Sequence, residues 1–446
     1  MVTTHDRSPS TPWYALCAAL SACGGGTLPQ FGQVSTPDGD LPTDSDSGAD
    51  LEPCTRTLTA PAMAVVPSIP PFVQVLGPTS ARLRFETTSD ALLPVLLLRE
   101  GQRCPAEAEP TRDGQKLDFR FPDTGATEQP EHRDLPGLHV LHEVLLEDLS
   151  PGETVGWEVE IGGSAVLDGS FRVPPAAGDA FTAVFVGDTQ APTSASVFDA
   201  AAMTQADVWL HGGDIQYPCN DLDTWSGFFW YAQPLTALMP VHFALGNHEL
   251  EGQDEFTVQW ERLIAGPGDA GTSRYHAFTW GDVRFVALDS ELGLDDLFSE
   301  QAVFLAGELD RVAADPALSC LVPYFHRPAW TLGNHAPRTD IREVLDTLFL
   351  GQPVPLVLQA HNHSYERFIV DGGAGSVTWV VDGGGGAGLY DVDANTDDYP
   401  DELKYRAYAE SSHGFTHLRF SAGCDIELKR YRTDGTEVDS AHIAGF

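Results

Sequence analysis

Basic residues are scarce in this sequence. Its 446 residues include 25 Lys and Arg against 65 Asp and Glu, which gives a formal net charge of −40 at pH 7. A protein with this charge repels polyanions and lacks the basic surface that nucleic acids require. We therefore exclude nucleic acid as a partner. A small phosphorylated molecule can still bind where metal ions supply positive charge locally.

Long apolar runs are also missing, because no stretch after residue 23 reaches the length that spans a membrane. A short apolar stretch at 13–22 follows Arg7 and ends in Leu20-Ser21-Ala22-Cys23, which resembles the bacterial lipobox. The alternative is an ordinary small-residue cleavage site with a chance cysteine. We predict a signal peptide over 1–23 and an exported protein. Its only membrane contact would be a lipid on Cys23, at the periplasmic or cell-surface side of a bacterial membrane.

Cysteine is sparse, and no pair has the Cys-x-x-Cys spacing of a zinc site. Export would remove Cys17, and lipid would modify Cys23. Five cysteines then remain: Cys54, Cys104, Cys219, Cys320 and Cys424. Export permits disulfides, but an odd number leaves at least one thiol free or paired between chains. We predict a disulfide between Cys54 and Cys104, which both lie in or beside one predicted domain.

The composition changes three times along the chain. Residues 24–57 are rich in Gly, Pro, Asp, Ser and Thr, which predicts a disordered tether. Residues 58–176 contain short alternating runs between Gly, Pro and Asp turns, which predicts an all-β sandwich. The segment 146–159 resembles the late strands of a fibronectin type III domain, although the usual corner tyrosine is missing. Residues 177–446 alternate strands with helices, which predicts a layered α/β domain.

In the α/β region, five apolar runs each lead directly into groups that can bind a metal. The runs are 181–186, 208–210, 241–245, 321–325 and 354–358. Helices are expected between them at 194–205, 297–314 and 339–348. Because ligands gather beyond the carboxyl ends of strands in α/β sheets, the five strand ends can converge on one point.

Taken singly, each of these groups has an ordinary structural interpretation. A Gly-Asp pair is usually a turn, and Asn247-His248 could cap a helix. His361 and His363 alternate along an extended segment, so they face opposite ways unless the backbone turns there. The ordered set of five favours a metal site over these separate readings. His211, just before the second Asp motif, is expected to be a buried strand-end residue and not a ligand.

The motifs Gly-Asp, Gly-Asp-x-x-Tyr, Gly-Asn-His-Glu, His and His-x-His-x-Tyr-Glu-Arg resemble the metallophosphoesterase superfamily, specifically its purple acid phosphatase branch. The resemblance covers residues 180–446 and implies a domain of two β-sheets sandwiched by helices. It implies that one ion, expected to be Fe³⁺, is held by Asp188, Asp214, Tyr217 and His363. It implies that the second ion, Fe²⁺, Zn²⁺ or Mn²⁺, is held by Asn247, His326 and His361, with Asp214 bridging both.

By the same resemblance, His248 is an outer-sphere histidine beside the phosphate, and His335 a second histidine that contacts the substrate. Tyr217 indicates the branch, because Gln190 stands where many metallophosphoesterases carry a liganding histidine. Ala336 and Ala360 depart from the family pattern without removing a ligand. Glu366 and Arg367 are expected to form an ion pair behind the site.

These observations predict a two-metal phosphoesterase that hydrolyses phosphate monoesters by attack of a metal-bound hydroxide. The first alternative is a phosphodiesterase or nucleotidase on the same scaffold. The second is a surface-binding lipoprotein with a vestigial site. The run Gly383–Gly386 is not a phosphate-binding P-loop, because no Lys-Ser/Thr follows it, and no Gly-x-Ser-x-Gly element supports a serine hydrolase.

Overall fold

The computed structural model describes most of the chain beyond residue 66. The described residues are 67–90, 93–102, 104–117, 137–160, 166–215, 224–250, 260–264, 268, 270–373 and 375–445. The chain divides into two compact units, Met1–Thr57 and Leu58–Phe446. The second unit contains all the described residues. No helix among them is long and apolar enough to cross a membrane.

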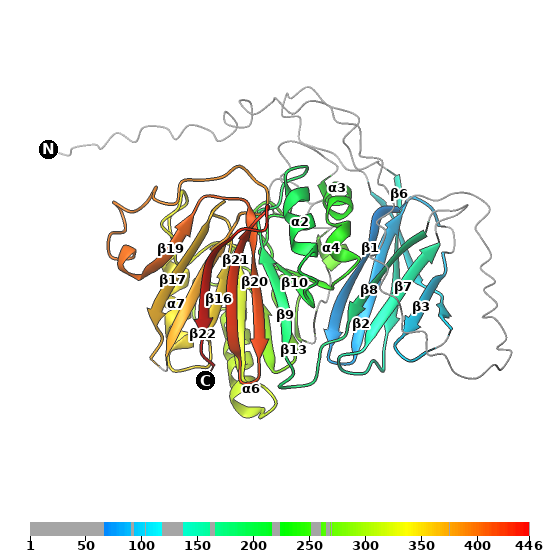
Figure 1. Cartoon of the computed structure of the whole chain (residues 1–446), viewed down its shortest axis with the longest axis horizontal. Helices are drawn as coiled ribbons and strands as arrows, with labels where there is room; N and C mark the ends of the chain where they lie inside the picture. Colours follow the sequence, from blue (N-terminus) through cyan, green and yellow to red (C-terminus); the bar gives the residue numbers. More distant parts are fainter. Residues whose placement is uncertain are drawn as a thin grey trace, which may run out of the picture. The chain divides into compact units, whose positions relative to one another are not determined.

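The first part of the second unit consists of two antiparallel four-stranded sheets. One sheet has the order β1 (Pro67–Gly77), β2 (Ser80–Thr87), β6 (Gly137–Leu146), β5 (Thr111–Leu117). The other has the order β4 (Ala106–Ala108), β3 (Val95–Arg99), β7 (Thr154–Glu160), β8 (Val166–Arg172). Inward side chains of both sheets, such as Leu83, Val95 and Val155, share one core. The predicted all-β region is therefore present (Figure 1), while its fibronectin type III identity stays a prediction.

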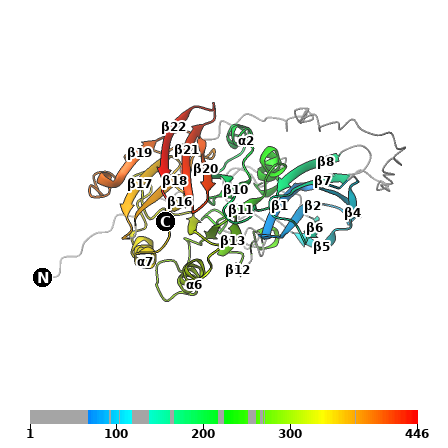
Figure 2. The same cartoon turned by 60° about the horizontal axis from the view of Figure 1, so that its bottom comes forward.

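The α/β part contains two larger mixed sheets. The six-stranded sheet has the order β11 (Val241–Phe243), β10 (Val208–His211), β9 (Phe181–Val186), β20 (Gly414–Ser421), β21 (Asp425–Arg432), β22 (Glu437–Ile443). The eight-stranded sheet has the order β12 (Ala270–Gly271), β13 (His276–Trp280), β14 (Val283–Ala287), β15 (Cys320–Phe325), β16 (Leu356–Gln359), β18 (Ser376–Asp382), β17 (Tyr365–Asp371), β19 (Arg406–Glu410). Figure 2 shows β20–β22 in red beside the green strands of the smaller sheet.

Alternation along the strands explains why the two sheets stack. In β9, Ala183 and Phe185 pack with Phe285 and Val322 of the other sheet, whereas Val184 and Val186 belong to a separate core outside. Successive side chains of a strand point to opposite faces, so a strand that is apolar at every position is buried on both sides. The predicted strand runs therefore lie at the centre of the layers.

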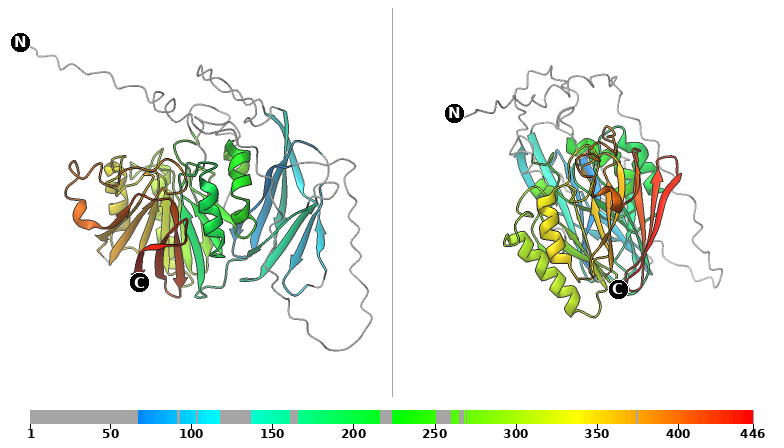
Figure 3. Two further views of the ribbon diagram at one scale, coloured as in Figure 1. Left: turned by 45° about the horizontal axis from the view of Figure 1, so that its top comes forward. Right: turned by 90° about the vertical axis from the view of Figure 1, so that its left-hand side faces the viewer.

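Helices cover the two outer faces. The helices α2 (Ser194–Ala202), α3 (Thr224–Tyr231) and α4 (Gln233–Thr236) pack with β9–β11. The helices α6 (Glu300–Ala314) and α7 (Thr339–Phe349) pack with β14–β16 and lie side by side in Figure 3. A short 3₁₀ helix, η2, spans Leu403–Tyr405. The two sheets sandwiched by helices confirm the predicted layered metallophosphoesterase fold.

Polar contacts connect the first four-stranded sheet to the α/β part. The Arg84 guanidinium donates to the Leu263 carbonyl oxygen at 2.8 Å, and the buried Glu86 carboxylate pairs with Arg262 and with His139. On β1, Phe72 stacks against Phe229 of α3 with ring centroids 4.6 Å apart. The sandwich strands and the α/β layers are thus packed together within one compact unit.

Candidate metal centre

The predicted ligands come from the carboxyl ends of five parallel strands, three in the smaller sheet and two in the larger. Asp188 follows β9, Asp214 follows β10 and Asn247 follows β11, while His326 follows β15 and His361 follows β16. Parallel pairing of β9, β10 and β11, and of β15 with β16, points the strands of each sheet the same way. The structure thus brings together side chains that are up to 173 residues apart.

Four of these residues form a buried cluster. One ligand atom from each of Asp188, Asp214, His326 and His361 lies within 4.8 Å of the others. Carboxylate oxygens and imidazole nitrogens suit iron, zinc or manganese, and sites of this composition rarely serve copper(I) or iron–sulfur clusters. The donor set therefore fits the metals expected from the sequence.

The hydrogen bonds of His326 aim one ring nitrogen into the cluster. Its Nδ1 lies 3.0 Å from the Gly212 carbonyl oxygen, which can only accept, so Nδ1 carries the hydrogen. Its Nε2 then faces Asp214 Oδ2 at 3.1 Å, Asn247 Oδ1 at 3.2 Å and His361 Nδ1 at 3.0 Å. These four atoms are the ones that the family resemblance assigns to the second ion.

His363 is oriented in the same manner. Its Nδ1 donates to the Gly388 carbonyl oxygen at 2.7 Å, and its Nε2 faces Asp188 Oδ1 at 3.4 Å. The other oxygen of Asp188 accepts the backbone N–H of His361 at 2.7 Å. A carbonyl that fixes the tautomer of a liganding histidine is a usual outer-sphere contact of metal sites. Asp188 and His363 thus form the described part of the predicted first ion site.

A turn in the backbone lets His361 and His363 serve one site. His361 has φ of 69°, in the left-handed region, so the segment is not a regular strand there. Asp188 and Asp214 share this conformation, with φ of 59° and 50°. Non-glycine residues held in this region cost free energy, and they concentrate at functional sites.

Glycines are required where the loops approach one another. A Cβ on Gly246 would lie 2.2 Å from Asp214 Oδ1, and a Cβ on Gly213, where φ is 91°, would lie 2.8 Å from the Gly246 nitrogen. A Cβ on Gly187 or Gly212 would collide with the methyl group of Ala360. Ala360 is one of the positions at which the sequence departs from the family pattern. The glycines before the ligands therefore permit close packing as well as a tight exit from the strand.

Both predicted substrate-contacting histidines lie beside the cluster. The His248 backbone N–H donates to Asp214 Oδ1 at 2.9 Å, and its Nε2 is 3.7 Å from Asp214 Oδ2. The His335 ring stacks on the ring of His361 with centroids 4.2 Å apart. Burial, reinforced by the charge of His363, lowers the pKa of His335 to about 4. The structure places both histidines next to predicted metal ligands, and their roles in catalysis also stay predictions.

Glu249 is a functional residue that sequence reasoning passed over. Its carboxylate accepts the backbone N–H groups of Asp214 at 3.0 Å, Ile215 at 2.8 Å and Gly246 at 2.8 Å. It therefore connects the loops after β10 and β11, which carry Asp214 and Asn247. Burial, together with the neighbouring Asp214, raises the pKa of Glu249 to about 7. Its position in the Gly-Asn-His-Glu motif was the available signal.

A second supporting carboxylate is Glu366, which accepts the N–H groups of Leu332 and Gly333 at 2.9 and 3.2 Å and so shapes the loop that carries His335. The expected ion pair between Glu366 and Arg367 is wrong. Arg367 pairs with Asp439 at 2.7 Å, and Glu366 lies 3.6 Å from Arg406. Adjacent residues of strand β17 point to opposite faces of the sheet, so their side chains take different partners.

His211 is structural, as expected. The Gly213 N–H donates to its Nδ1 at 3.2 Å, and its Nε2 lies 3.0 Å from Thr189 Oγ1. Burial, with a smaller effect of His326, lowers the pKa of His211 to about 3, so the ring is neutral. Both ring nitrogens are used inside the fold, which leaves neither for a metal.

The comparisons with known proteins agree with this geometry. Residues 181–365 match the calcineurin-like phosphoesterase family. That segment holds all the described ligands. This part of the chain is therefore similar to the metallophosphoesterases. Its relatives among curated proteins are purple acid phosphatases, which confirms the predicted branch of the superfamily.

Probable purple acid phosphatase 20 of Arabidopsis thaliana is 28% identical over 240 residues, which cover 51% of this chain and 55% of the relative. Purple acid phosphatase 22 of the same plant is 28% identical over 212 residues, covering 45% and 48%. Probable inactive purple acid phosphatase 9 is 26% identical over 192 residues, covering 35% and 29%. The chain thus spans about half the length of the first two of these relatives.

Among solved structures, the purple acid phosphatase PPD1 from yellow lupin (Lupinus luteus) seeds has a TM-score of 0.67 at 18% identity, covering 84% of this chain and 74% of that one. PhoD has a TM-score of 0.58 at 13% identity, covering 87% and 94%. At these identities the likeness shows a shared fold. It extends over the sandwich strands as well as the α/β layers of this chain.

Three of the predicted functional residues, Tyr217, Cys23 and Cys54, lie outside the described residues. Tyr217 therefore stays a predicted ligand, and Cys23 a predicted lipidation site. Cys104 is disulfide-bonded, but its predicted pairing with Cys54 stays a prediction for the same reason.

Proposed function

We propose that this chain hydrolyses phosphate monoesters at a centre of two metal ions. The observation that carries the proposal is the arrangement of ligand atoms around Asp214. One group contains Asp188 and His363, and the other contains Asn247, His326 and His361. The Asp214 carboxylate contacts the second group through Oδ2 and lies in one cluster with Asp188, as a bridging ligand would.

The expected ions are Fe³⁺ and a second ion, Fe²⁺, Zn²⁺ or Mn²⁺. When bound, such a pair neutralises charge on the phosphoryl oxygens and lowers the pKa of a coordinated water. The chain's own contribution is to hold the ligands in place. The ends of the strands position them, backbone carbonyl oxygens orient the rings of His326 and His363, and the Glu249 carboxylate binds the backbone of two ligand loops. The site is built from preorganised groups, which is the main requirement for stabilising a developing charge.

His248 is the proposed proton donor to the leaving alcohol. Its ring lies against Asp214, and its side chain is 19% exposed, so it can reach both the centre and a substrate. His335, on the face of His361, is the proposed second contact to the transferring group. Both positions agree with outer-sphere roles, in which a positioned imidazole hydrogen-bonds the substrate.

We also propose that the protein is exported and lipid-anchored through Cys23. The disulfide between Cys320 and Cys424 supports an oxidising compartment, because such bonds persist mainly after export. The proposed partner is a small phosphorylated substrate, and the only proposed membrane contact is the lipid.

The test combines metal analysis of the purified protein with two substrates. We expect two metal ions per chain and faster hydrolysis of p-nitrophenyl phosphate than of bis-p-nitrophenyl phosphate. Faster hydrolysis of the diester would establish the phosphodiesterase alternative. Absence of both metal and hydrolysis would favour a binding lipoprotein with a vestigial site. One of the similar proteins is itself described as a probable inactive purple acid phosphatase, so this outcome is included in the test.

A further inference from the structure

Arg327 is a cationic side chain held at the edge of the metal-ligand cluster. It directly follows His326, and its backbone N–H donates to Ser290 Oγ at 2.8 Å. Its Nε donates to both carboxylate oxygens of Glu291, at 2.8 and 2.9 Å. Its Nη1 lies 2.9 Å from His361 Nε2. The side chain is 29% exposed, so it borders solvent as well as the cluster.

The contact with Arg327 decides which nitrogen of His361 carries the hydrogen. A guanidinium can only donate, so His361 Nε2 must accept from Arg327. The hydrogen of the neutral His361 ring then lies on Nδ1, which donates to His326 Nε2 at 3.0 Å. That assignment agrees with His326, whose own hydrogen on Nδ1 faces the Gly212 carbonyl oxygen.

An ion bound in the cluster reverses the His361 tautomer. The cluster-facing atom of His361 is Nδ1, and a metal ligand must offer a lone pair. If the Nδ1 lone pair of a neutral His361 bound an ion, the hydrogen of the ring would lie on Nε2. Two N–H donors, His361 Nε2 and Arg327 Nη1, would then face each other across 2.9 Å. The Arg327–His361 bond must then break, while Glu291 still holds the guanidinium through Nε.

We propose that Arg327 is a substrate-binding residue. In the metal-free protein its Nη1 donates to His361, and once ions are bound it would donate to the phosphoryl oxygens of the substrate instead. The released Nη1 lies beside His361, the ring on which His335 stacks, so it borders the proposed substrate side of the centre. A planar guanidinium fixed by a carboxylate matches phosphate oxygens well. This inference rests on the proposed two-metal function.

The proposal predicts different effects of Arg327→Ala on the binding of phosphate and on the binding of Zn²⁺. The dissociation constant of inorganic phosphate for the metal-loaded protein should rise about tenfold to a hundredfold, the usual effect of losing a hydrogen bond to a charged group. The dissociation constant of Zn²⁺ for the metal-free protein should stay the same or fall, because no Arg327–His361 bond has to break. A residue that merely orients His361 would weaken both affinities when removed.

Calorimetric titrations with Zn²⁺ alone and with inorganic phosphate measure the two constants. Arg338→Ala is the matched control, since Arg338 contacts the Ser290 carbonyl oxygen at 3.3 Å and pairs with Asp340 instead. It should leave both constants unchanged. Glu291→Gln should weaken phosphate binding less than Arg327→Ala does. Arg327→Lys keeps the charge but loses the planar guanidinium, so its dissociation constant for phosphate should lie between those of the wild type and Arg327→Ala. This variant keeps the test valid if the alanine variant misfolds.

Unchanged phosphate affinity in Arg327→Ala, or weaker Zn²⁺ binding, would overturn the role of Arg327 while the two-metal function stands. A wild-type protein that binds neither Zn²⁺ nor phosphate would instead overturn the proposed function and the inference with it.

Discussion

The ligands of this centre are held by backbone conformations that few side chains adopt. Asp188, Asp214 and His361 all have positive φ, and each lies two or three residues past the end of a buried strand. The surrounding loops maintain this conformation through bonds such as the Asp188 N–H to the Gly213 carbonyl oxygen at 3.0 Å. Strain concentrated at a site in this manner is stored by the rest of the fold.

Asp214→Asn tests the bridging carboxylate. The amide keeps the shape of Asp214 but removes the charge that two cations would share. We expect loss of at least one metal ion per chain and a fall in turnover of about a hundredfold or more, because metal activation of water supplies much of the catalysis. Metal analysis and p-nitrophenyl phosphate turnover measure both. Asp434→Asn, in the exposed turn between β21 and β22, is the control, and near-normal turnover with full metal content in Asp214→Asn would refute the bridge.

Tyr217→Phe tests the proposed colour of the centre. A phenol, whose ordinary pKa is near 10, ionises when it binds Fe³⁺ and then absorbs visible light by charge transfer. We expect a pink to purple wild type with iron, and a bleached variant whose first iron is easier to reduce. Absorbance spectra before and after ascorbate measure this, with Tyr408→Phe on β19 as control. A colourless wild type that is fully active with two zinc ions would contradict the assignment of Tyr217.

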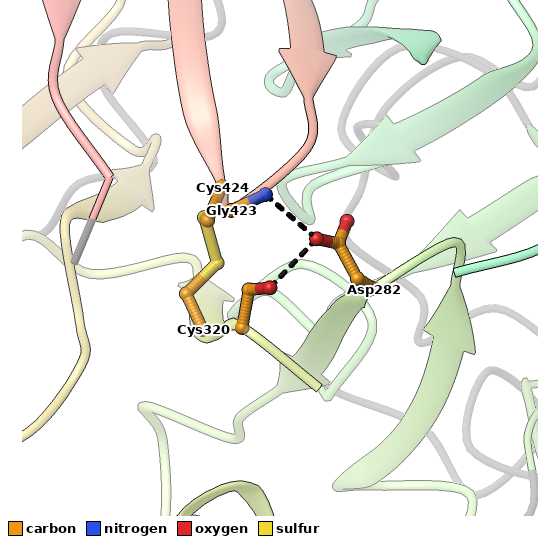
Figure 4. Close-up of a disulfide and its surroundings, with 5 residues drawn as sticks. Asp282, Cys320, Gly423 and Cys424 are labelled. Atoms are coloured by element: carbon orange, nitrogen blue, oxygen red, sulfur yellow. Dashed lines mark hydrogen bonds between the residues drawn. A yellow bond between two sulfur atoms is a disulfide. The ribbon is translucent and has the colours of Figure 1, made fainter. Parts of the chain in front are cut away.

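At the scale of elements, one disulfide joins the two sheets of the α/β part. Cys320 begins β15 of the larger sheet, and Cys424 lies in the turn between β20 and β21 of the smaller one. Beside it, the Asp282 carboxylate accepts Ser319 Oγ at 2.7 Å and the Gly423 N–H at 3.0 Å (Figure 4). The bond lies at the start of β15, while His326 follows the other end of the same strand.

Removing that disulfide should destabilise the fold and spare the site. For a sequence separation of 104 residues, the chain-entropy estimate is about 4–5 kcal/mol of unfolding free energy. We expect Cys320→Ser with Cys424→Ser to lower the denaturant midpoint strongly at unchanged metal content. Reductant should lower the midpoint of the wild type more than that of the double variant, in which, among the described residues, only the disulfide at Cys104 remains to be reduced. Equal midpoints for wild type and variant would show that the bond contributes little.

At the scale of the whole molecule, buried neutral histidines make stability depend on pH. Burial, with smaller effects of Arg82 and Arg284, lowers the pKa of His276 to about 3. An unfolded histidine titrates near 6.5, so below that pH the unfolded state binds a proton that the folded state does not. Stability present above pH 6.5 is therefore lost as the pH falls toward 3, by up to about 1.4 kcal/mol per pH unit for each such histidine.

His276→Phe tests this dependence away from the metal site. Neither ring nitrogen of His276 makes a hydrogen bond within the described residues, and its ring lies near Phe278 and His242. An apolar ring of similar shape should keep or raise the melting temperature at pH 7.5, and reduce its fall between pH 7.5 and 5. Thermal melts of metal-free protein measure this. His442→Gln, at an exposed position beside Asp425, should leave the pH dependence unchanged, and an equally steep fall in His276→Phe would reject the explanation.

Cys23→Ala tests the proposed attachment of the whole protein to a membrane. Without the sulfur that carries lipid, we expect the protein to move from the membrane fraction to the soluble fraction, because that lipid is its proposed membrane contact. Cell fractionation with a salt wash measures the distribution, and Cys17→Ala is the control. A Cys23→Ala protein that stays on washed membranes would show that another element holds it there.

The sequence by itself predicted the parts of this protein that depend on neighbouring residues. Each core strand and the ligand after it, from Asp188 to His361, are adjacent in the chain, so pattern and spacing sufficed. It also predicted the three helices to within a few residues of α2, α6 and α7. It did not predict which of the five strands lies in which of the two sheets, because strand pairing joins segments far apart in the chain.

Only the tertiary structure decided the supporting contacts. Arg327 meets His361 across 34 residues, and Cys320 meets Cys424 across 104. Glu249 shows the same limit, because its acidic type was visible but its three backbone partners were not. Which atoms meet depends on how the layers stack and which way each ring turns. The stacking of the layers and the orientation of each ring depend on packing and on hydrogen bonding in the buried interior. The pattern of neighbouring residues in the sequence does not predict either.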